Sequence, residues 1–255
     1  MLKSRIIPVL LIREKGLVKT TKFSDDKYVG DPLNAVRIFN EKEVDELTVF
    51  DIDATVNGTV PDLKLIEHLA AECRMPLCYG GGIKTLEQAQ SILALGVEKV
   101  ALSSAAIENP KLVSDIATQV GNQSVVVVLD VKKKFFGGYK VYTHNGTKLV
   151  KKDLFELLKE FQNLGAGEIV INNIDLDGTQ KGYDTQLISI LKSELNIPFT
   201  VCGGASSYSD IAKAIKDYSP IGLAVGSIFV FKGKYRAVLI SYPNKAEKEL
   251  IYNYE

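Results

Sequence analysis

Cysteine and histidine, the residues that most often bind transition metals, are scarce in this sequence. It has three cysteines (Cys73, Cys78 and Cys202) and two histidines (His68 and His144). The odd number and irregular spacing of the cysteines match no metal site and favour free thiols in a reducing cytoplasm. The histidines belong to no partner pattern, so we interpret both as structural. We therefore expect a cytoplasmic protein without a metal or another cofactor.

Net charge and long apolar runs are also missing. Lys and Arg together number 31, as do Asp and Glu, which argues against binding to nucleic acid or to an anionic membrane. No apolar run approaches the roughly 20 residues of a membrane span. The segment MLKSRIIPVLLIREKG has only a short apolar stretch that ends in charged residues, with no small-residue cleavage site behind it. We therefore expect no signal peptide.

Short apolar runs, by contrast, recur along the whole chain. They are rich in Val and Ile and show no alternation, which is typical of parallel strands buried on both faces. The eight candidate strands are Arg5 to Ile12, Glu46 to Ile52, Met75 to Tyr79, Lys99 to Leu102, Ser124 to Leu129, Glu168 to Ile174, Pro198 to Cys202 and Gly222 to Val225. Helical patterns lie between them. Eight such units in about 250 residues predict one closed (β/α)₈ TIM barrel over residues 1–255, rather than an open sheet or two small domains.

The chain also carries a weak internal repeat. The pairs Gly81-Gly82 and Gly203-Gly204 each follow a strand and lie about 120 residues apart. Ser104 and Ser227 are separated by nearly the same interval. This spacing predicts two similar half-barrels of about four strand–helix units each.

We expect the functional site at the carboxyl ends of the strands, as in other barrels of this type. Glycine lets backbone N–H groups approach a phosphate closely because it has no Cβ. Two candidate phosphate cradles follow, one at Gly81, Gly82, Ser103 and Ser104 and the other at Gly203, Gly204, Gly226 and Ser227. Such a pair fits a substrate with a phosphate at each end. The alternative is that the glycines merely make tight turns.

Carboxylates also stand at strand ends. Asp130 follows a run of four valines and a leucine, a setting in which a carboxylate must be paired, solvated or shifted in pKa. We interpret Asp130 as a site carboxylate, against the alternative of a structural ion pair. Asp51 and Asp177 are weaker candidates at other strand ends. Lys19, expected in a loop after the first strand, is either a phosphate ligand or a surface lysine.

Charged residues mark the opposite ends of four strands. Four charged residues each begin a candidate strand: Arg5, Glu46, Lys99 and Glu168. Each lies an even number of residues before a position near the other end of its strand, so the two side chains point to the same side. If that side faces inward, they ring the base of the barrel. Spacing alone favours a ring that closes the base over one that gates a small neutral molecule. The segment from 131 to 144 has two strand-like parts around a glycine pair and predicts a hairpin, either a lid over the site or a solvated excursion.

Motifs along nearly the whole chain resemble one known family. They are RIIPVLLI at 5–12, GDP at 30–32, DELTVFDIDAT at 45–55, PLCYGGGI at 76–83, EKVALSSAA at 98–106, LGAGEIVINNIDLDGTQKGYD at 164–184 and VCGGAS at 201–206. These segments resemble the cyclase subunit of imidazole glycerol phosphate synthase. The combination of LGAGEI with DGT-x-x-GYD is specific, because a generic barrel does not require it.

The resemblance implies a barrel that takes ammonia from a glutaminase subunit docked at its N-terminal face. The ammonia then meets a bis-phosphate ribulosyl substrate at the other end, and the products are imidazole glycerol phosphate and an aminoimidazole carboxamide ribotide. By this resemblance the ammonia gate is formed by Arg5, Glu46, Lys99 and Glu168. The matching substrate-site positions are Lys19, Gly82, Ser104, Asp130, Asp177, Gly204 and Ser227.

Position 11 departs from the family, which places the first of two acid–base aspartates there. Leu11 cannot transfer a proton, and losing a general acid or base typically lowers the rate about 10²- to 10⁴-fold. Glu14, three residues on, would have to swing in to replace it. Val9 and Ser103 stand where many relatives carry Cys and Asn.

A paralogous branch of the family has this character and accompanies a glutaminase and a sugar amidotransferase in surface-polysaccharide synthesis. The sequence therefore predicts a glutaminase-bound ammonia conduit that serves a third protein. One alternative is an authentic cyclase of histidine biosynthesis. Another, of a different class, is a non-catalytic phosphate-binding scaffold barrel. A phosphosugar isomerase of similar fold is a further option, although it also needs the acid–base pair that Leu11 removes.

Overall fold

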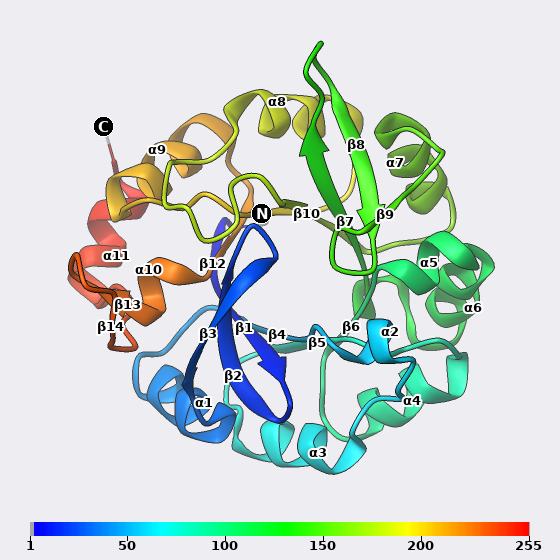
Figure 1. The fold of residues 1–255 in the computed structure, drawn as a ribbon, viewed down its shortest axis with the longest axis horizontal. Helices are drawn as coiled ribbons and strands as arrows, with labels where there is room; N and C mark the ends of the chain where they lie inside the picture. Colours follow the sequence, from blue (N-terminus) through cyan, green and yellow to red (C-terminus); the bar gives the residue numbers. More distant parts are fainter. Residues whose placement is uncertain (1–2, 255) are drawn as a thin grey trace.

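Eight parallel strands close into a barrel in the computed structural model, which describes residues 3–254 (Figure 1). The barrel strands, in spatial order, are β1 (Arg5–Arg13), β4 (Leu47–Asp51), β5 (Leu77–Gly80), β6 (Lys99–Leu102), β7 (Val125–Lys133), β10 (Glu168–Asn173), β11 (Phe199–Cys202) and β12 (Gly222–Val225). Closure comes from the pairing of β12 with β1. The predicted (β/α)₈ barrel and its eight strands are confirmed.

Helices surround the barrel on its outer side (Figure 1). The longer ones are α1 (Pro32–Glu41), α3 (Leu63–Glu72), α4 (Leu86–Ala94), α6 (Lys111–Val120), α7 (Leu154–Asn163), α8 (Thr185–Glu194), α9 (Tyr208–Tyr218) and α11 (Lys245–Tyr252). Side-chain caps fix where several of them start; Asp153, for example, accepts a hydrogen bond from the backbone N–H of Glu156 at α7. No helix within residues 3–254 is long and apolar enough to cross a membrane.

Several small elements at the carboxyl ends of the strands were not predicted. They are the hairpin β2 (Gly16–Thr21) and β3 (Ser24–Gly30), the short helices α2 (Ala54–Asn57), α5 (Ser104–Glu108) and α10 (Ser227–Val230), and the hairpin β13 (Phe231–Lys232) and β14 (Ala237–Val238). The expectation that Lys19 lies in a loop is therefore wrong. It lies on β2, which continues from β1 as its antiparallel partner.

The predicted hairpin after the fifth barrel strand is confirmed, but its bounds differ. The expected end of that strand at Leu129 is wrong, because β7 runs on to Lys133 and pairs with β8 (Tyr139–Thr143). A short strand, β9 (Lys148–Leu149), extends this sheet. The hairpin tip projects past the ring of helices (Figure 1), and Phe135 and Phe136 at the tip are 94% and 96% exposed.

The molecule has two apolar regions. The larger lies outside the barrel, where the outer faces of the strands pack against the helices. A small inner cluster fills the centre of the barrel and consists of Cys78, Ala101, Val126, Val128 and Val170, with Phe50 and Cys202 against it. Residues of the inner cluster point inward because side chains alternate along each strand between the barrel centre and the helices. The cluster lies between the charged base of the barrel and its open mouth.

Candidate functional site

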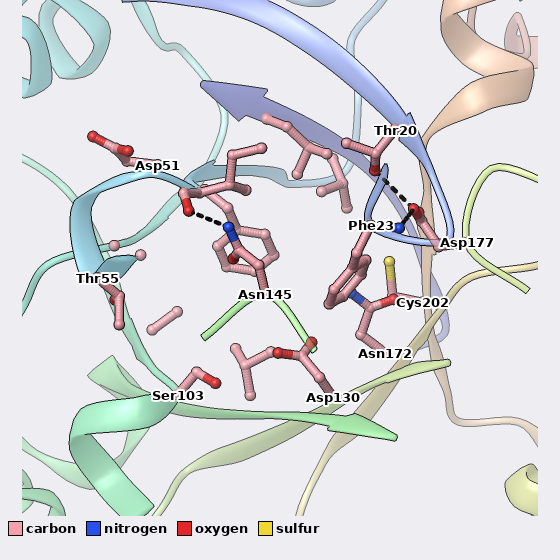
Figure 2. Close-up of a pocket in the computed structure, with 18 of the residues that line it drawn as sticks. Thr20, Phe23, Asp51, Thr55, Ser103, Asp130, Asn145, Asn172, Asp177 and Cys202 are labelled. Carbon is pink, nitrogen blue, oxygen red and sulfur yellow. Dashed lines mark hydrogen bonds between the residues drawn. The ribbon is translucent and has the colours of Figure 1, made fainter. Parts of the chain in front are cut away.

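A cavity of about 210 Å³ opens at the carboxyl ends of the strands, and we call it the mouth cavity (Figure 2). Every site residue predicted at these strand ends lines it. These residues are Lys19, Asp51, Gly81, Gly82, Ser103, Ser104, Asp130, Asp177, Gly203, Gly204, Gly226 and Ser227. The structure thus brings together groups that are more than 200 residues apart in sequence.

Glycine is required at both predicted phosphate cradles. Gly82 has φ of +72°, and a Cβ there would lie 2.9 Å from the backbone oxygen of Thr59. Gly204 has φ of +106°, and its Cβ would lie 2.2 Å from the oxygen of Gly182. Side chains at these positions would therefore strain the backbone and collide with it. The two turns follow β5 and β11, at matching places in the two half-barrels.

Serines complete each half of the cavity. Ser103 and Ser104 follow β6, and Gly226 and Ser227 follow β12. The Ser104 hydroxyl is buried and accepts a hydrogen bond of 3.4 Å from the backbone N–H of His144. Gly226 has no side chain, and a Cβ there would lie 3.1 Å from Nζ of Lys19.

Lys19 is folded into the cavity rather than exposed to solvent. Its side chain is buried, and Nζ donates a hydrogen bond to the backbone oxygen of Val9. Burial lowers the pKa of this amine to about 8, although the nearby Asp177 opposes the shift. A phosphate that reached this amine would find a donor with few competing contacts.

Asp130 lies at the point where β7 leaves the barrel. Burial raises the pKa of its carboxyl to about 7, with Asn172 acting in the opposite direction and Asp177 adding to the rise. A carboxyl with this pKa exchanges its proton near neutral pH, which suits general acid–base chemistry. Figure 2 shows Asp130 facing the cavity beside Asn172.

The other two carboxylates of the cavity also hold backbone in place. Asp177 accepts hydrogen bonds from the Thr20 hydroxyl (2.7 Å) and the Phe23 N–H (3.3 Å), so it anchors the β2–β3 hairpin over the mouth. Asp51 accepts N–H bonds from Asp53 and Ala54 at 3.0 Å each. Burial raises the pKa of both carboxyls.

The four charged residues at the strand starts do meet, and we call them the charged ring: Arg5, Glu46, Lys99 and Glu168. Nζ of Lys99 lies 2.8 Å from Glu46 and 2.9 Å from Glu168. The Arg5 guanidinium lies 2.8 Å from Glu168 and also pairs with Glu46. Both carboxylate side chains are only 6% exposed. The ring therefore spans the base of the barrel with alternating charges.

Charge pairing dominates the chemistry of the ring. Burial would raise the pKa of Glu168, but Arg5 and Lys99 outweigh it and hold the pKa at about 2. The same contacts raise the pKa of Lys99 and Arg5 against the effect of burial. Thr200 donates a further hydrogen bond to Glu168. Arg5, Lys99 and Glu168 are therefore ionised at neutral pH.

A second, much smaller cavity of about 10 Å³ lies directly inside the ring, and we call it the inner chamber. Glu46 and Glu168 form its lower end, and the apolar positions Ile7, Val126 and Val170 form part of its wall. This volume admits about one molecule the size of water. Three residues, Val9, Phe50 and Ala224, line both the inner chamber and the mouth cavity. They form the partition between the two spaces.

Comparisons with known proteins agree with this architecture. A family model described as histidine biosynthesis protein matches residues 5–236. A protein of Vibrio vulnificus, provisionally named imidazole glycerol phosphate synthase subunit hisF3, is 61% identical over 98% of this chain and 96% of its own length. The chain belongs to the imidazole glycerol phosphate synthase cyclase-subunit family.

Two further relatives differ in identity. A Pseudomonas aeruginosa protein provisionally named as subunit hisF2 of the same synthase is 50% identical, over 96% of this chain and 97% of its own length. The synthase subunit HisF of Exiguobacterium sibiricum is 39% identical, over 90% of this chain and 91% of its own length. This member of the cyclase-subunit family is thus more similar to relatives named as second or third copies than to this HisF.

The mouth of this cyclase-subunit homologue has an apolar side. Leu11 on β1 lines the cavity next to Phe50 on β4, at the position where the resemblance predicts an aspartate. Glu14 does not replace it, because it lies exposed in the turn after β1 and does not line the cavity. Among the described residues, the cavity carboxylates are Asp51, Asp130, Asp177 and, near its rim, Glu108.

Sequence reasoning missed three cavity residues. His144, interpreted as structural, lines the cavity and lies 3.9 Å from Glu108. Asn145 reaches across the opening, and its Nδ2 donates a 2.8 Å hydrogen bond to the oxygen of Ile52 (Figure 2). The return segment after β8 is therefore what covers the mouth, while the hairpin tip does not. The third residue is Asn172, which also lines the cavity and whose residue type and spacing predict no particular role.

Proposed function

We propose that this chain receives ammonia from a glutaminase at the base of the barrel and conducts it to the mouth, for amidation of a sugar in surface-polysaccharide synthesis. One observation carries the proposal: a charged ring closes on an apolar chamber whose far wall is also the floor of the mouth cavity. A route that passes from the charged ring through the inner chamber to the mouth cavity suits a small neutral molecule. The third protein, a sugar amidotransferase, would take the ammonia.

The chemistry along the route supports ammonia over its protonated form. Ammonium would have to leave its partners at the charged ring and enter a chamber walled by Ile7, Val126 and Val170, which would remove its hydration. Neutral ammonia is about the size of water and carries no such penalty. The charged ring would open by exchanging partners between Lys99 and the two carboxylates, and the partition at Val9, Phe50 and Ala224 would then be the last barrier.

The mouth cavity supports a phosphorylated ligand. Its two glycine and serine cradles lie on opposite half-barrels, and Lys19 supplies a cation near the second one. Within this proposal the cradles hold a phosphorylated small molecule while Asp130 handles the proton. Asp51 and Asp177 shape the same cavity through their backbone hydrogen bonds.

The apolar side of the mouth favours an ammonia conduit over an authentic cyclase. A proton-transfer pair needs two groups on opposite sides of the reacting atoms, and of the two positions that the resemblance gives to such a pair only Asp130 carries a carboxylate, because the other is Leu11. The second candidate, the cyclase of histidine biosynthesis, is favoured by the intact charged ring, both cradles and Asp130. A scaffold barrel without ammonia transport would need neither the charged ring nor the chamber.

The first experiment measures cyclase turnover of the purified chain with the ribulosyl bis-phosphate substrate and excess ammonium salt at mildly alkaline pH. We expect no turnover above background. Turnover close to that of an ordinary cyclase subunit would contradict the conduit proposal and establish the second candidate. The synthase from Exiguobacterium sibiricum, assayed in parallel, is the positive control.

The second experiment separates a conduit from a scaffold. The chain is co-expressed with a candidate glutaminase subunit from the same organism, and co-purification and glutamine hydrolysis are measured. We expect a stable complex whose glutaminase is faster than the free subunit. Lys99→Met should change ammonia transfer or glutaminase stimulation, whereas Lys111→Met, which breaks an exposed pair with Asp115, should not. If no complex forms, the conduit proposal is contradicted and the scaffold barrel is favoured.

A further inference from the structure

Asp130 and Asn172 stand opposite each other on adjacent strands. The register of β7 and β10 pairs Val128 with Val170 and, two positions further toward the mouth, Asp130 with Asn172. Val128 and Val170 belong to the inner apolar cluster. On these two strands Asp130 and Asn172 are therefore the first polar side chains above the apolar interior, and both line the mouth cavity.

The Asn172 side chain has an unused acceptor. Asn172 lowers the pKa of the Asp130 carboxyl against the larger effect of burial, while its Oδ1 is buried and accepts no hydrogen bond from any residue within 3–254. A buried carbonyl oxygen without a donor costs free energy, so such an atom is rare unless a ligand satisfies it. The next strand offers only the Cys202 thiol opposite Asn172, and burial raises the pKa of that thiol to about 12.

We propose that Asp130 and Asn172 form a binding site for ammonia where it leaves the barrel interior, with Oδ1 of Asn172 and the carboxylate of Asp130 accepting its N–H groups. The inference rests on the proposed conduit and deepens it. Ammonia has three N–H donors and one lone pair, so two acceptors on one side would leave the lone pair directed into the cavity. The bound nitrogen would be oriented for attack on an acceptor molecule.

The surroundings favour this ligand over others with the same size or charge. A phosphate would be repelled by Asp130, and its cradles lie elsewhere in the cavity. The wall opposite, at Leu11, Val9 and Phe50, is apolar, and Oδ1 of the adjacent Asp51 already accepts two backbone N–H bonds. Lys19 is a donor, but Nζ is engaged with the Val9 oxygen. Oδ1 of Asn172 and the carboxylate of Asp130 therefore favour a ligand that donates N–H hydrogen bonds on this side of the mouth.

The test uses the intact chain labelled with ¹³C-aspartate and ¹⁵N-asparagine. Ammonium chloride is titrated at pH 8 and again at a more alkaline pH, with potassium chloride and tetramethylammonium chloride at equal ionic strength as controls. We expect a saturable shift of the Asp130 carboxyl and the Asn172 side-chain amide that neither control salt produces and whose midpoint follows the concentration of neutral ammonia, so that less total salt is needed at the higher pH; a midpoint that follows ammonium instead would contradict an ammonia site. Equal shifts with potassium chloride, or no shift, would overturn the site.

Three variants sharpen the result. Asn172→Leu removes the acceptor at similar size and should weaken ammonium binding at least tenfold, whereas Asn172→Asp keeps an oxygen and should retain it. Asn163→Leu, an exposed position at the end of α7 that does not line the cavity, should leave the affinity unchanged. An ammonium response that survives Asn172→Leu would contradict the inference. If the chain forms a normal complex with the glutaminase but does not bind ammonia, only the Asp130–Asn172 site is contradicted. If it binds ammonia but forms no complex, the conduit proposal is contradicted instead.

Discussion

Leu11 and Phe50 are paired in register across β1 and β4, and both side chains line the mouth cavity. The apolar pair faces the polar pair of Asp130 and Asn172 on β7 and β10. Leu11 and Phe50 thus give the mouth an apolar surface opposite Asp130. The carboxylate beside this surface, Asp51, already accepts backbone N–H bonds from Asp53 and Ala54.

Leu11→Asp should supply a second carboxylate at the position where the resemblance predicts one. We expect cyclase turnover to rise at least about 10²-fold above the background rate, because a positioned acid or base contributes about 10²- to 10⁴-fold. The assay is product formation from the ribulosyl bis-phosphate with ammonium salt. Leu11→Asn is the matched control, since it adds polarity without a titrating group. Equal gains in both variants would contradict the missing-carboxylate explanation.

Asp130→Asn should stabilise the fold above neutral pH. The pKa of Asp130 is raised from 3.8 to about 7, so the folded state favours the protonated form and loses stability as pH rises through this range. The shift corresponds to at most about 4 kcal/mol, and solvent in the cavity reduces this. Urea unfolding at pH 4 and pH 8 measures it. We expect the free energy of unfolding of the variant to exceed that of the native chain at pH 8 but not at pH 4. The same difference at both pH values would show that ionisation of Asp130 is not the cause.

Glu168→Gln should destabilise the base of the barrel. It leaves Arg5 and Lys99 with a single carboxylate, Glu46, and breaking a buried ion pair costs roughly 3 kcal/mol or more. Because the pKa of Glu168 is lowered to about 2, its stabilising effect is present above pH 4.5 and is lost as pH falls toward 2. Glu160→Gln, which removes a partly exposed pair with Lys152, should cost under about 1 kcal/mol. Denaturant unfolding at neutral pH compares them.

Gly204→Ala and Gly226→Ala should separate stability from phosphate binding. At position 204 a Cβ would strike the Gly182 oxygen in a left-handed backbone, so we expect a loss of at least about 1 kcal/mol. At position 226 the Cβ would meet only the flexible end of Lys19, so stability should stay near the native value. The rise in Tm that inorganic phosphate produces should nevertheless shrink in Gly226→Ala. An unchanged phosphate effect there would remove Gly226 from the cradle.

Asn145→Ala should loosen the segment that covers the mouth. Nδ2 of Asn145 donates the hydrogen bond that ties this segment to Ile52 on the far side of the opening. We expect faster amide exchange over residues 143–147, with a global stability change of only about 1 kcal/mol. Hydrogen–deuterium exchange read by mass spectrometry measures both. Uniform acceleration through the barrel strands would indicate a general destabilisation instead.

The sequence by itself determined the barrel and the position of its site. Continuous apolar runs require strands buried on both faces, and parallel strands bring their carboxyl ends to one rim, so Gly82, Asp130, Gly204 and Ser227 had to meet there. Parity likewise predicted that the charges at the strand starts share one side. The motifs predicted the family, which the relatives confirm, and they predict a departure from it at Leu11.

Only the tertiary structure decided which of these groups touch. Parity gives the side of a strand but not its register with the next one, so the pairing of Asp130 with Asn172 was not readable from the chain. Nor could local patterns show that Lys19 turns inward or that Asn145 spans the mouth. Such contacts join residues far apart in sequence, and they are set by how the closed barrel brings its loops together, which no local propensity encodes.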